Sequence, residues 1–160
     1  MAVLRLILLL AAFLSAAPVA ANDLVGVASV IDADTLEIRG VRIRLHGIDA
    51  PESRQLCTNP SGQQWRCGQQ AALALSDRIG RRSVNCAVRD VDRYDRAIAV
   101  CTQDNQDLNL WLVNEGWAVA YRRYARDYIG AEDQARRAGR NIWAGQFVMP
   151  WDWRQGQRLP

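Results

Sequence analysis

The chain has 160 residues and a formal net charge of +3, and all twenty of its basic residues are arginines because it contains no lysine. This length suits one domain with one sizeable core, and no repeat, low-complexity tract or linker indicates a second domain. Arginine matches phosphate geometry well, so the composition permits an anionic partner, although the mild charge alone does not identify one.

Residues 1–21 form an apolar segment that we expect to be a signal peptide. Arg5 is its only charge, and small residues at positions 19–21 are typical of the site that signal peptidase cuts. A membrane anchor is the alternative, but Pro18 interrupts the apolar run and leaves it short for a span. The sequence thus predicts a single domain over residues 22–160, exported to a periplasm or secreted, with no membrane attachment after signal cleavage.

The first part of the domain is predicted to form strands. The run over residues 27–32 is apolar up to its final aspartate, whereas residues 35–38 and 41–45 alternate between apolar and polar side chains. Arg39 and Gly40 form the turn between the two alternating strands. We therefore expect a hairpin close to the start of the domain.

Helices and a second hairpin are predicted in the rest of the chain. The pattern favours helices over residues 67–80, 108–116 and about 130–138, each ending at or just before a glycine. Residues 84–102 are predicted to form a hairpin that turns at Arg93-Tyr94. Strands first and then helices interspersed with a later hairpin is an α+β pattern, and five short strands with a helix in the middle fit a small barrel such as the OB-fold.

Four cysteines allow three disulfide pairings, and export favours disulfides because exported compartments are oxidising. In the predicted second hairpin, Cys86 and Cys101 lie directly opposite each other, which suits a cross-strand disulfide. Cys57 and Cys67 then close a short loop. A zinc site is the alternative, but the chain has one histidine and no Cys-x-x-Cys pair. We therefore predict the disulfides Cys57–Cys67 and Cys86–Cys101.

Five acidic residues lie in the first hairpin or beside it: Asp32, Asp34, Glu37, Asp49 and Glu52. Each has a simple structural interpretation. Glu37 suits a solvated strand, the first two aspartates suit a strand end, and the run DAPE at 49–52 resembles a helix start with a capping box. The alternative is a metal site, because calcium and magnesium prefer hard oxygen ligands and a few carboxylates, water and a substrate phosphate can satisfy them.

Two arginines accompany these acids, and phosphodiester hydrolysis needs positive groups around an activated water. Arg44 lies between the two acidic clusters, and Arg96 follows the turn of the second hairpin; guanidinium groups can bind phosphate through two hydrogen bonds. His46, the only histidine, is expected to lie on the sheet surface or to support the site from outside, so water is the expected nucleophile. With a strict two-residue turn, Asp34 and Arg44 project to opposite faces; either a bulge re-aims one of them, or Asp34 lies beyond the regular strand.

From about Val27 to Trp143 the sequence resembles the staphylococcal nuclease (thermonuclease) family. The resemblance rests on five runs: VIDADTL at 30–36, RLHGIDAPE at 44–52, DRYDR at 92–96, VNEGWA at 113–118 and NIW at 141–143. The second run is the most specific, because an arginine, an aspartate five residues later and then x-P-E form the core of the family signature. The resemblance implies a five-stranded OB-fold barrel with three helices, and calcium-dependent cleavage of DNA and RNA that leaves 3′-phosphate ends.

The resemblance also implies roles for individual residues on the metal side of the site. Asp34 and Asp49 match the calcium carboxylates of the family, and the backbone carbonyl of Ala50 matches a further calcium ligand. Glu52 matches the glutamate that orients or deprotonates the attacking water.

On the substrate side, Arg44 and Arg96 match the two arginines that hold the phosphate and stabilise a phosphorane-like transition state. Tyr94 and Tyr121 match tyrosines that line the nucleotide pocket.

Two residues depart from the family pattern. Ala33 replaces a glycine in the usual DGDT run, which would strain the backbone if that position has a positive φ. Asp95 replaces a usual glycine beside the second arginine and brings a negative charge toward the phosphate site.

The tail over about residues 144–160 lies beyond the resembling core. Packing of the C-terminus onto the barrel is its simpler interpretation, and the alternative is an extra nucleic-acid contact through Trp151, Trp153 and Arg154. We expect DNA and RNA as substrates, a monomer and no stable protein partner. A non-catalytic nucleic-acid-binding module on the same fold is the alternative function, and a protein-interaction domain would leave the acids and arginines unexplained.

Overall fold

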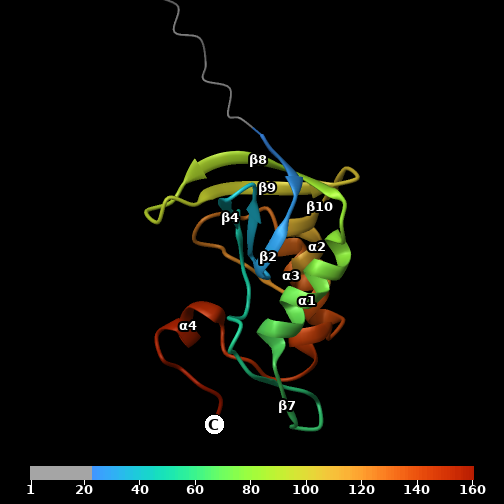
Figure 1. Ribbon diagram of the computed structural model, residues 1–160. Helices are drawn as coiled ribbons and strands as arrows, with labels where there is room; N and C mark the ends of the chain where they lie inside the picture. Colours follow the sequence, from blue (N-terminus) through green and yellow to red (C-terminus); the bar gives the residue numbers. More distant parts are fainter. Residues whose placement is uncertain (1–22) are drawn as a thin grey trace, which may run out of the picture.

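The computed structural model describes residues 23–160, so the predicted signal peptide lies outside the described residues. In Figure 1 a curved sheet forms one end of the molecule, helices cover one side of it, and the C-terminal segment lies at the opposite end. Across residues 23–160 we find no helix with both the length and the apolar character needed to cross a bilayer.

The main sheet curls into a small barrel. Its six principal strands are β1 (Leu24–Val27), β2 (Ser29–Asp32), β3 (Thr35–Ile38), β4 (Val41–Leu45), β8 (Ser83–Val91) and β9 (Ala97–Gln103). They neighbour one another in the order β1-β8-β9-β4-β3-β2, and only Ala28 separates β1 from β2. These two therefore act as one bent strand that belongs to both edges of the sheet, which gives the five strands of an OB-fold. The predicted α+β barrel is confirmed.

Four shorter strands and a small extension complete the β-structure. The strand β5 (Ile48–Asp49) pairs with β11 (Val119–Ala120), and β6 (Cys57–Thr58) pairs with β7 (Gln64–Trp65). β10 (Gln106–Asp107) extends the main sheet beside β9. The β5–β11 pair matters for function because it anchors the chain just before the DAPE run.

The first hairpin forms as predicted. Ile38 pairs with Val41, so Arg39 and Gly40 make a two-residue turn, and both have positive φ (52° and 80°) as a type I′ turn requires. Thr35 pairs with Arg44 at the other end of the hairpin. Asp34 precedes β3 and lies beyond the regular strand, so the second of the two alternatives for its orientation is correct.

The second hairpin has the predicted pairing but a longer turn. Cys86 lies opposite Cys101, and their disulfide joins Cα atoms 4.0 Å apart. The register shifts between Val88 and Asp90, so the turn spans residues 92–96 and is not the predicted two-residue turn. The wider turn is stabilised by the side chain of Asp92, which accepts hydrogen bonds from backbone N–H groups within the turn.

The three predicted helices are confirmed as α1 (Cys67–Ile79), α2 (Leu108–Asn114) and α3 (Ile129–Arg137). A 3₁₀ turn, η1 (Asn141–Ala144), and a short helix, α4 (Pro150–Arg154), follow them. The helix start suggested by the DAPE run is wrong, because the chain after Asp49 continues as a loop. The Asp49 carboxylate accepts hydrogen bonds from two arginine side chains and does not cap a helix.

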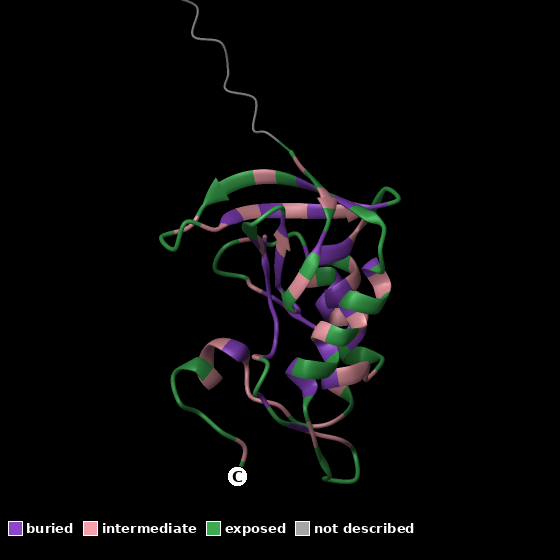
Figure 2. Ribbon diagram, in the orientation of Figure 1, coloured by how far each residue is buried: buried purple, intermediate pink, exposed green. Residues whose placement is uncertain are grey.

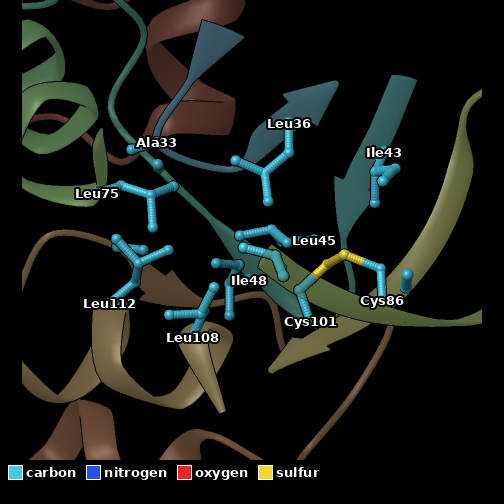
Figure 3. Packing of buried hydrophobic residues seen from close by; sticks show 14 of the residues in the cluster. Ala33, Leu36, Ile43, Leu45, Ile48, Leu75, Cys86, Cys101, Leu108 and Leu112 are labelled. Atoms are coloured by element: carbon cyan, nitrogen blue, oxygen red, sulfur yellow. A yellow bond between two sulfur atoms is a disulfide. The ribbon is translucent and has the colours of Figure 1, made fainter. Parts of the chain in front are cut away.

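The main core fills the barrel and the space between the barrel and the helices. Leu36, Ile43 and Leu45 from the barrel meet Leu108 and Leu112 of α2 there (Figure 3). Buried positions on the helices accordingly face the sheet, whereas their outer surfaces are exposed (Figure 2). This core fixes β3 and β4, the strands beside the acidic residues.

A second, smaller core lies under the C-terminal segment. Its buried members are the disulfide-bonded Cys57 and Cys67 together with Val119 and Ile142. Partly buried aromatic and apolar side chains pack on it: Trp65, Trp143, Phe147, Met149 and Trp151. The tail thus packs beside the chain that follows the DAPE run, and both predicted disulfides are present.

Candidate active site

The carboxylates of Asp34 and Asp49 lie on the two arms of one guanidinium group. Arg44 Nη1 forms an ion pair with Asp34 Oδ2, and Arg44 Nη2 lies 2.7 Å from Asp49 Oδ1. The backbone N–H of Ala50 donates to Asp34 Oδ2 over 2.9 Å. Asp34 is 7% exposed and Asp49 is fully buried, so the hairpin and the following strand bring two acids together in a place that is largely shielded from water.

The pairing of β3 with β4 explains this arrangement. Arg44 lies opposite Thr35, so the preceding residue, Asp34, is at the end of the hairpin within reach of its guanidinium group. Burial lowers the pKa of Arg44, and this effect outweighs the opposing effect of Asp49. The guanidinium group nevertheless remains charged at neutral pH, as arginine does in proteins.

Glu52 lies in the loop after β5, held through its backbone. Its N–H donates to Gln55 Oε1 over 3.2 Å, and its carbonyl accepts from the N–H of Gln55 over 2.7 Å. The start of α1 packs against the same carbonyl: a Cβ atom added at Gly68 would lie only 1.8 Å from it. The Glu52 side chain is 31% exposed and can meet a solvent molecule while its backbone stays fixed.

Arg96 and Tyr94 lie at the turn of the second hairpin. Asp92 Oδ2 binds Arg96 through Nε at 2.8 Å and Nη2 at 2.7 Å. The guanidinium groups of Arg93 and Arg96 lie over the ring of Tyr94, with centroid distances of 4.8 and 5.6 Å. Tyr94 is 65% exposed, so one aromatic side chain with two cations beside it projects from this turn.

The turn and the acidic hairpin face a common region. β4 and β9 are parallel neighbours, and Arg44 pairs with Ile98. Arg96 lies two residues before Ile98 along the chain, just ahead of β9. Burial is the largest cause of the lowered pKa of Arg44, and the positive charge of Arg96 lowers that pKa further. Burial would raise the pKa of Asp92, but hydrogen bonds from Arg96 and Tyr94 outweigh it and the pKa is lowered.

The two departures from the family pattern have ordinary geometry. Ala33 does not have a positive φ, so the strain considered for that position does not arise, and its side chain is fully buried. Asp95 has a φ of 61°, a conformation that aspartate tolerates better than most residues. Its side chain is exposed.

The ring of Tyr121 packs against two other aromatic side chains. The ring of Trp151 stacks on it with a centroid distance of 5.4 Å and an interplanar angle of 8°, and Tyr124 meets it edge-on at 4.8 Å. The ring face of Tyr121 on which Trp151 stacks is therefore occupied by an aromatic side chain of the tail.

Arg154 is the residue of this site that sequence reasoning missed. From α4 its Nη1 lies 3.1 Å from Asp49 Oδ1 and 2.6 Å from Glu52 Oε1, while its Nη2 lies 2.7 Å from Asp49 Oδ2. The sequence suggests Arg154 only as an alternative nucleic-acid contact, because no sequence signal connects it to acids that precede it by 105 and 102 residues. Burial lowers the pKa of Arg154, but its hydrogen bonds to both acids outweigh burial and the net shift is upward.

The charges and ligand types of the site fit a hard divalent cation. Asp34, Asp49 and Glu52 face the guanidinium groups of Arg44 and Arg154, so carboxylates outnumber the adjacent cations by one. Within residues 23–160, no cluster of three or more His, Cys, Asp or Glu side chains is arranged to hold a metal. A cation would thus take two carboxylates from the chain and its other ligands from backbone, water or a substrate phosphate.

Comparisons with known proteins agree on one family. The model of the family described as "Staphylococcal nuclease homologue" matches residues 42–145. A succinoglycan biosynthesis protein, ExoI, of Rhizobium meliloti is 38% identical over 130 residues, which cover 79% of this chain and 68% of that protein. An uncharacterized endonuclease of Haemophilus influenzae is 32% identical over 141 residues (83% and 74% covered), and a micrococcal nuclease of Shigella flexneri is 31% identical over 150 residues (82% and 80%).

Proposed function

The chain belongs to the staphylococcal nuclease family, and on that premise we propose that it is a calcium-dependent nuclease that hydrolyses phosphodiester bonds in DNA and RNA. The observation that carries this proposal is the close grouping of two buried carboxylates on Arg44 with Glu52 in the adjacent loop. Such a group supplies both the oxygen ligands for a hard cation and a carboxylate able to take a proton from water.

The metal side of the reaction is assigned to the barrel. Asp34 and Asp49 would hold calcium together with the backbone carbonyl of Ala50, all three being nearly or fully buried. When bound, the ion would neutralise charge on a phosphate oxygen and help to acidify water. Few protein ligands imply a modest affinity, which suits an exported protein in a calcium-containing medium.

Glu52 is assigned as the general base. Its carboxylate would accept a proton from the attacking water, whose oxygen forms a new bond to phosphorus while the bond from phosphorus to the 5′ oxygen breaks. The leaving 5′ oxygen would take a proton from solvent water and become a hydroxyl, so the phosphate stays on the 3′ side. Fixation of the Glu52 backbone by Gln55 and by the start of α1 supports this role, since a base must be held close to its geometry.

Arg44 and Arg96 are assigned to the phosphate. Each guanidinium group has five N–H donors, and the acidic partners of each do not use all of them. Positive groups that bind the developing equatorial charge stabilise the transition state. Tyr94, exposed at the turn, and Tyr121 would contact bases, and stacking on aromatic rings tolerates any sequence.

We also infer that the protein acts outside the cytoplasm as a monomer, in a periplasm or secreted, without a stable protein partner. Two disulfides support an oxidising compartment, and the apolar sequence of residues 1–21 supports the expectation of a signal peptide.

The test is digestion of single-stranded DNA and RNA by the purified, oxidised protein with calcium, with magnesium and with a chelator. We expect cleavage in calcium, 3′-phosphate ends and no cleavage in chelator. The Glu52→Gln variant should lose about 10²- to 10⁴-fold in rate with an unchanged far-UV spectrum. DNA that stays intact in calcium but is still bound would instead indicate a non-catalytic nucleic-acid-binding module.

A further inference from the structure

The C-terminal segment, residues 146–154, is attached to the loop that carries Glu52. The N–H of Thr58 donates to the carbonyl of Gln146 over 2.8 Å, and the buried side chain of Gln55 donates to the carbonyl of Val148 over 2.6 Å. The same Gln55 holds the N–H of Glu52. The segment is thus connected through hydrogen bonds to the backbone of the proposed general base.

At the end of this segment, Arg154 engages both oxygens of Asp49 and one oxygen of Glu52, at 2.6 to 3.1 Å. Asp49 Oδ1 also accepts from Arg44, so two guanidinium groups share one fully buried carboxylate. The Arg154 side chain is itself 39% exposed. It is more exposed than either acid that it binds, so it lies between the buried Asp49 carboxylate and the solvent on its side of the site.

This contact opposes the binding of a divalent cation in two ways. An ion that takes Asp49 as a ligand needs an oxygen that Arg154 already binds. A guanidinium group beside Asp49 also repels the ion directly, because like charges at short distance are unfavourable. Without Arg154, only Arg44 would balance the carboxylates Asp34, Asp49 and Glu52, and the local field would favour a cation more strongly.

We propose that Arg154 is a positioning residue of the site: it holds Asp49 and Glu52 from the C-terminal helix and competes with the divalent cation for Asp49, so that cation binding and the docking of α4 oppose each other. This inference rests on the proposed calcium site. Because coupling between two binding events is reciprocal, the cation loosens α4 by the same factor by which a docked α4 weakens cation binding.

The docking of α4 can be followed independently of any activity. Trp151 belongs to the same helix, and its ring stacks on Tyr121 at a centroid distance of 5.4 Å. Release of α4 should change tryptophan fluorescence and expose the backbone amides of residues 151–154 to hydrogen exchange.

The experiment compares calcium affinity in four oxidised proteins, measured by displacement of terbium luminescence: wild type, Arg154→Met, Arg154→Lys and Arg158→Met. Arg158 is a matched control, because it also lies in the tail and its guanidinium group contacts Trp153, not the acids. We expect Arg154→Met to lower the calcium dissociation constant about tenfold, within the usual range of coupling between sites. The calcium dissociation constant of Arg154→Lys should lie between those of the wild type and Arg154→Met, since lysine keeps the charge but lacks the planar fork of arginine. The dissociation constant of Arg158→Met should match that of the wild type.

A merely structural role for Arg154 predicts the opposite sign, because disordered acids would bind calcium more weakly. An unchanged or raised dissociation constant in Arg154→Met, beside normal calcium binding in the wild type, would overturn this inference and leave the proposed nuclease intact. Absence of calcium binding in all four proteins would overturn both. In the wild type, calcium should also accelerate hydrogen exchange in residues 151–154, and exchange that slows would contradict the competition.

Discussion

The two halves of the site are built over very different distances along the chain. The barrel half consists of Asp34, Arg44, Asp49 and Ala50, whose mutual contacts join residues 5 to 16 positions apart. The tail half consists of Val148 and Arg154, whose contacts to Gln55 and to the acids join residues 93 to 105 positions apart.

The halves also differ in how they are held. The barrel half is part of a hairpin fixed by the main core, and its carboxylates are nearly or fully buried. The tail half depends on a five-residue helix and a smaller core, and its arginine is 39% exposed. The difference separates a buried part that carries the proposed calcium ligands from a more exposed part that, by the inference above, weakens calcium binding.

Loss of Arg44 should do the greatest damage, because it breaks the barrel half at its centre. Arg44→Met leaves the buried Asp34 without a cation and Asp49 with Arg154 alone, and removal of one partner from a buried pair costs about 3–5 kcal/mol. Urea unfolding of the variant, beside Arg154→Met, checks this directly. Arg154→Met should lose only about 1 kcal/mol, since solvent reaches that pair; equal losses in the two variants would remove the distinction between the halves.

The disulfide beneath the tail should have the next largest effect. Replacement of Cys57 and Cys67 by alanine opens a loop whose ends are 10 positions apart, and the chain-entropy relation gives a loss of about 3 kcal/mol in the free energy of unfolding. We expect faster hydrogen exchange in residues 146–154 of this variant at a temperature where it stays folded. Removal of the Cys86–Cys101 disulfide should cost a similar amount, with little change in exchange within that segment.

A single methyl group should perturb the tail half alone. The Cβ atom of Gly145→Ala would lie 1.9 Å from the carbonyl oxygen of Thr58, so the segment has to shift, at a cost of about 1–3 kcal/mol. Thermal unfolding measures the loss. Gly130→Ala in α3 is the control, because the new Cβ meets nothing within 4 Å, and it should leave stability unchanged or raise it by less than about 1 kcal/mol. A neutral Gly145→Ala would show that the tail tolerates displacement.

The smallest expected effect concerns the turn that carries Arg96. The pKa of Asp92 is lowered in the folded protein, so its contribution to stability is present above the ordinary value near 3.8 and is lost as the pH falls through the lowered one. Asp92→Asn should therefore destabilise by less than about 1 kcal/mol at pH 7. The difference from the wild type, measured by urea unfolding, should shrink below about pH 4, and a difference that grows in acid would contradict this sign.

The barrel half was largely predictable from sequence. Strict alternation in residues 41–45 and the Arg39-Gly40 turn set the register, and the register places Arg44 beside Asp34. The long turn after β8 was missed, because one bulged residue shifts the register without altering the apolar pattern. The DAPE run led to the wrong prediction of a helix start, because a capping box and a pair of candidate site carboxylates can have the same sequence. Only the arginines around Asp49 in the folded chain distinguish the two.

The tail half could not be predicted in the same way. Apolar and aromatic residues in a tail indicate packing but not the surface on which they pack, so nothing in residues 144–160 pointed Arg154 toward Asp49. The contact of Gly68 could not be predicted either. A glycine at a helix start does not indicate that the carbonyl group of another loop packs against it. Long-range contacts of this kind depend on the assembled fold.

The Cys57–Cys67 disulfide has a consequence for the cell that makes the protein. It closes the loop that begins just after Glu52 and supports the core on which the C-terminal segment rests. In a reducing cytoplasm both sulfurs would remain thiols, and the loop and the segment would lack this covalent support. A nuclease would thus be least well assembled beside the DNA and RNA of the cell that makes it, and under the proposed export it would gain its full stability only in an oxidising compartment.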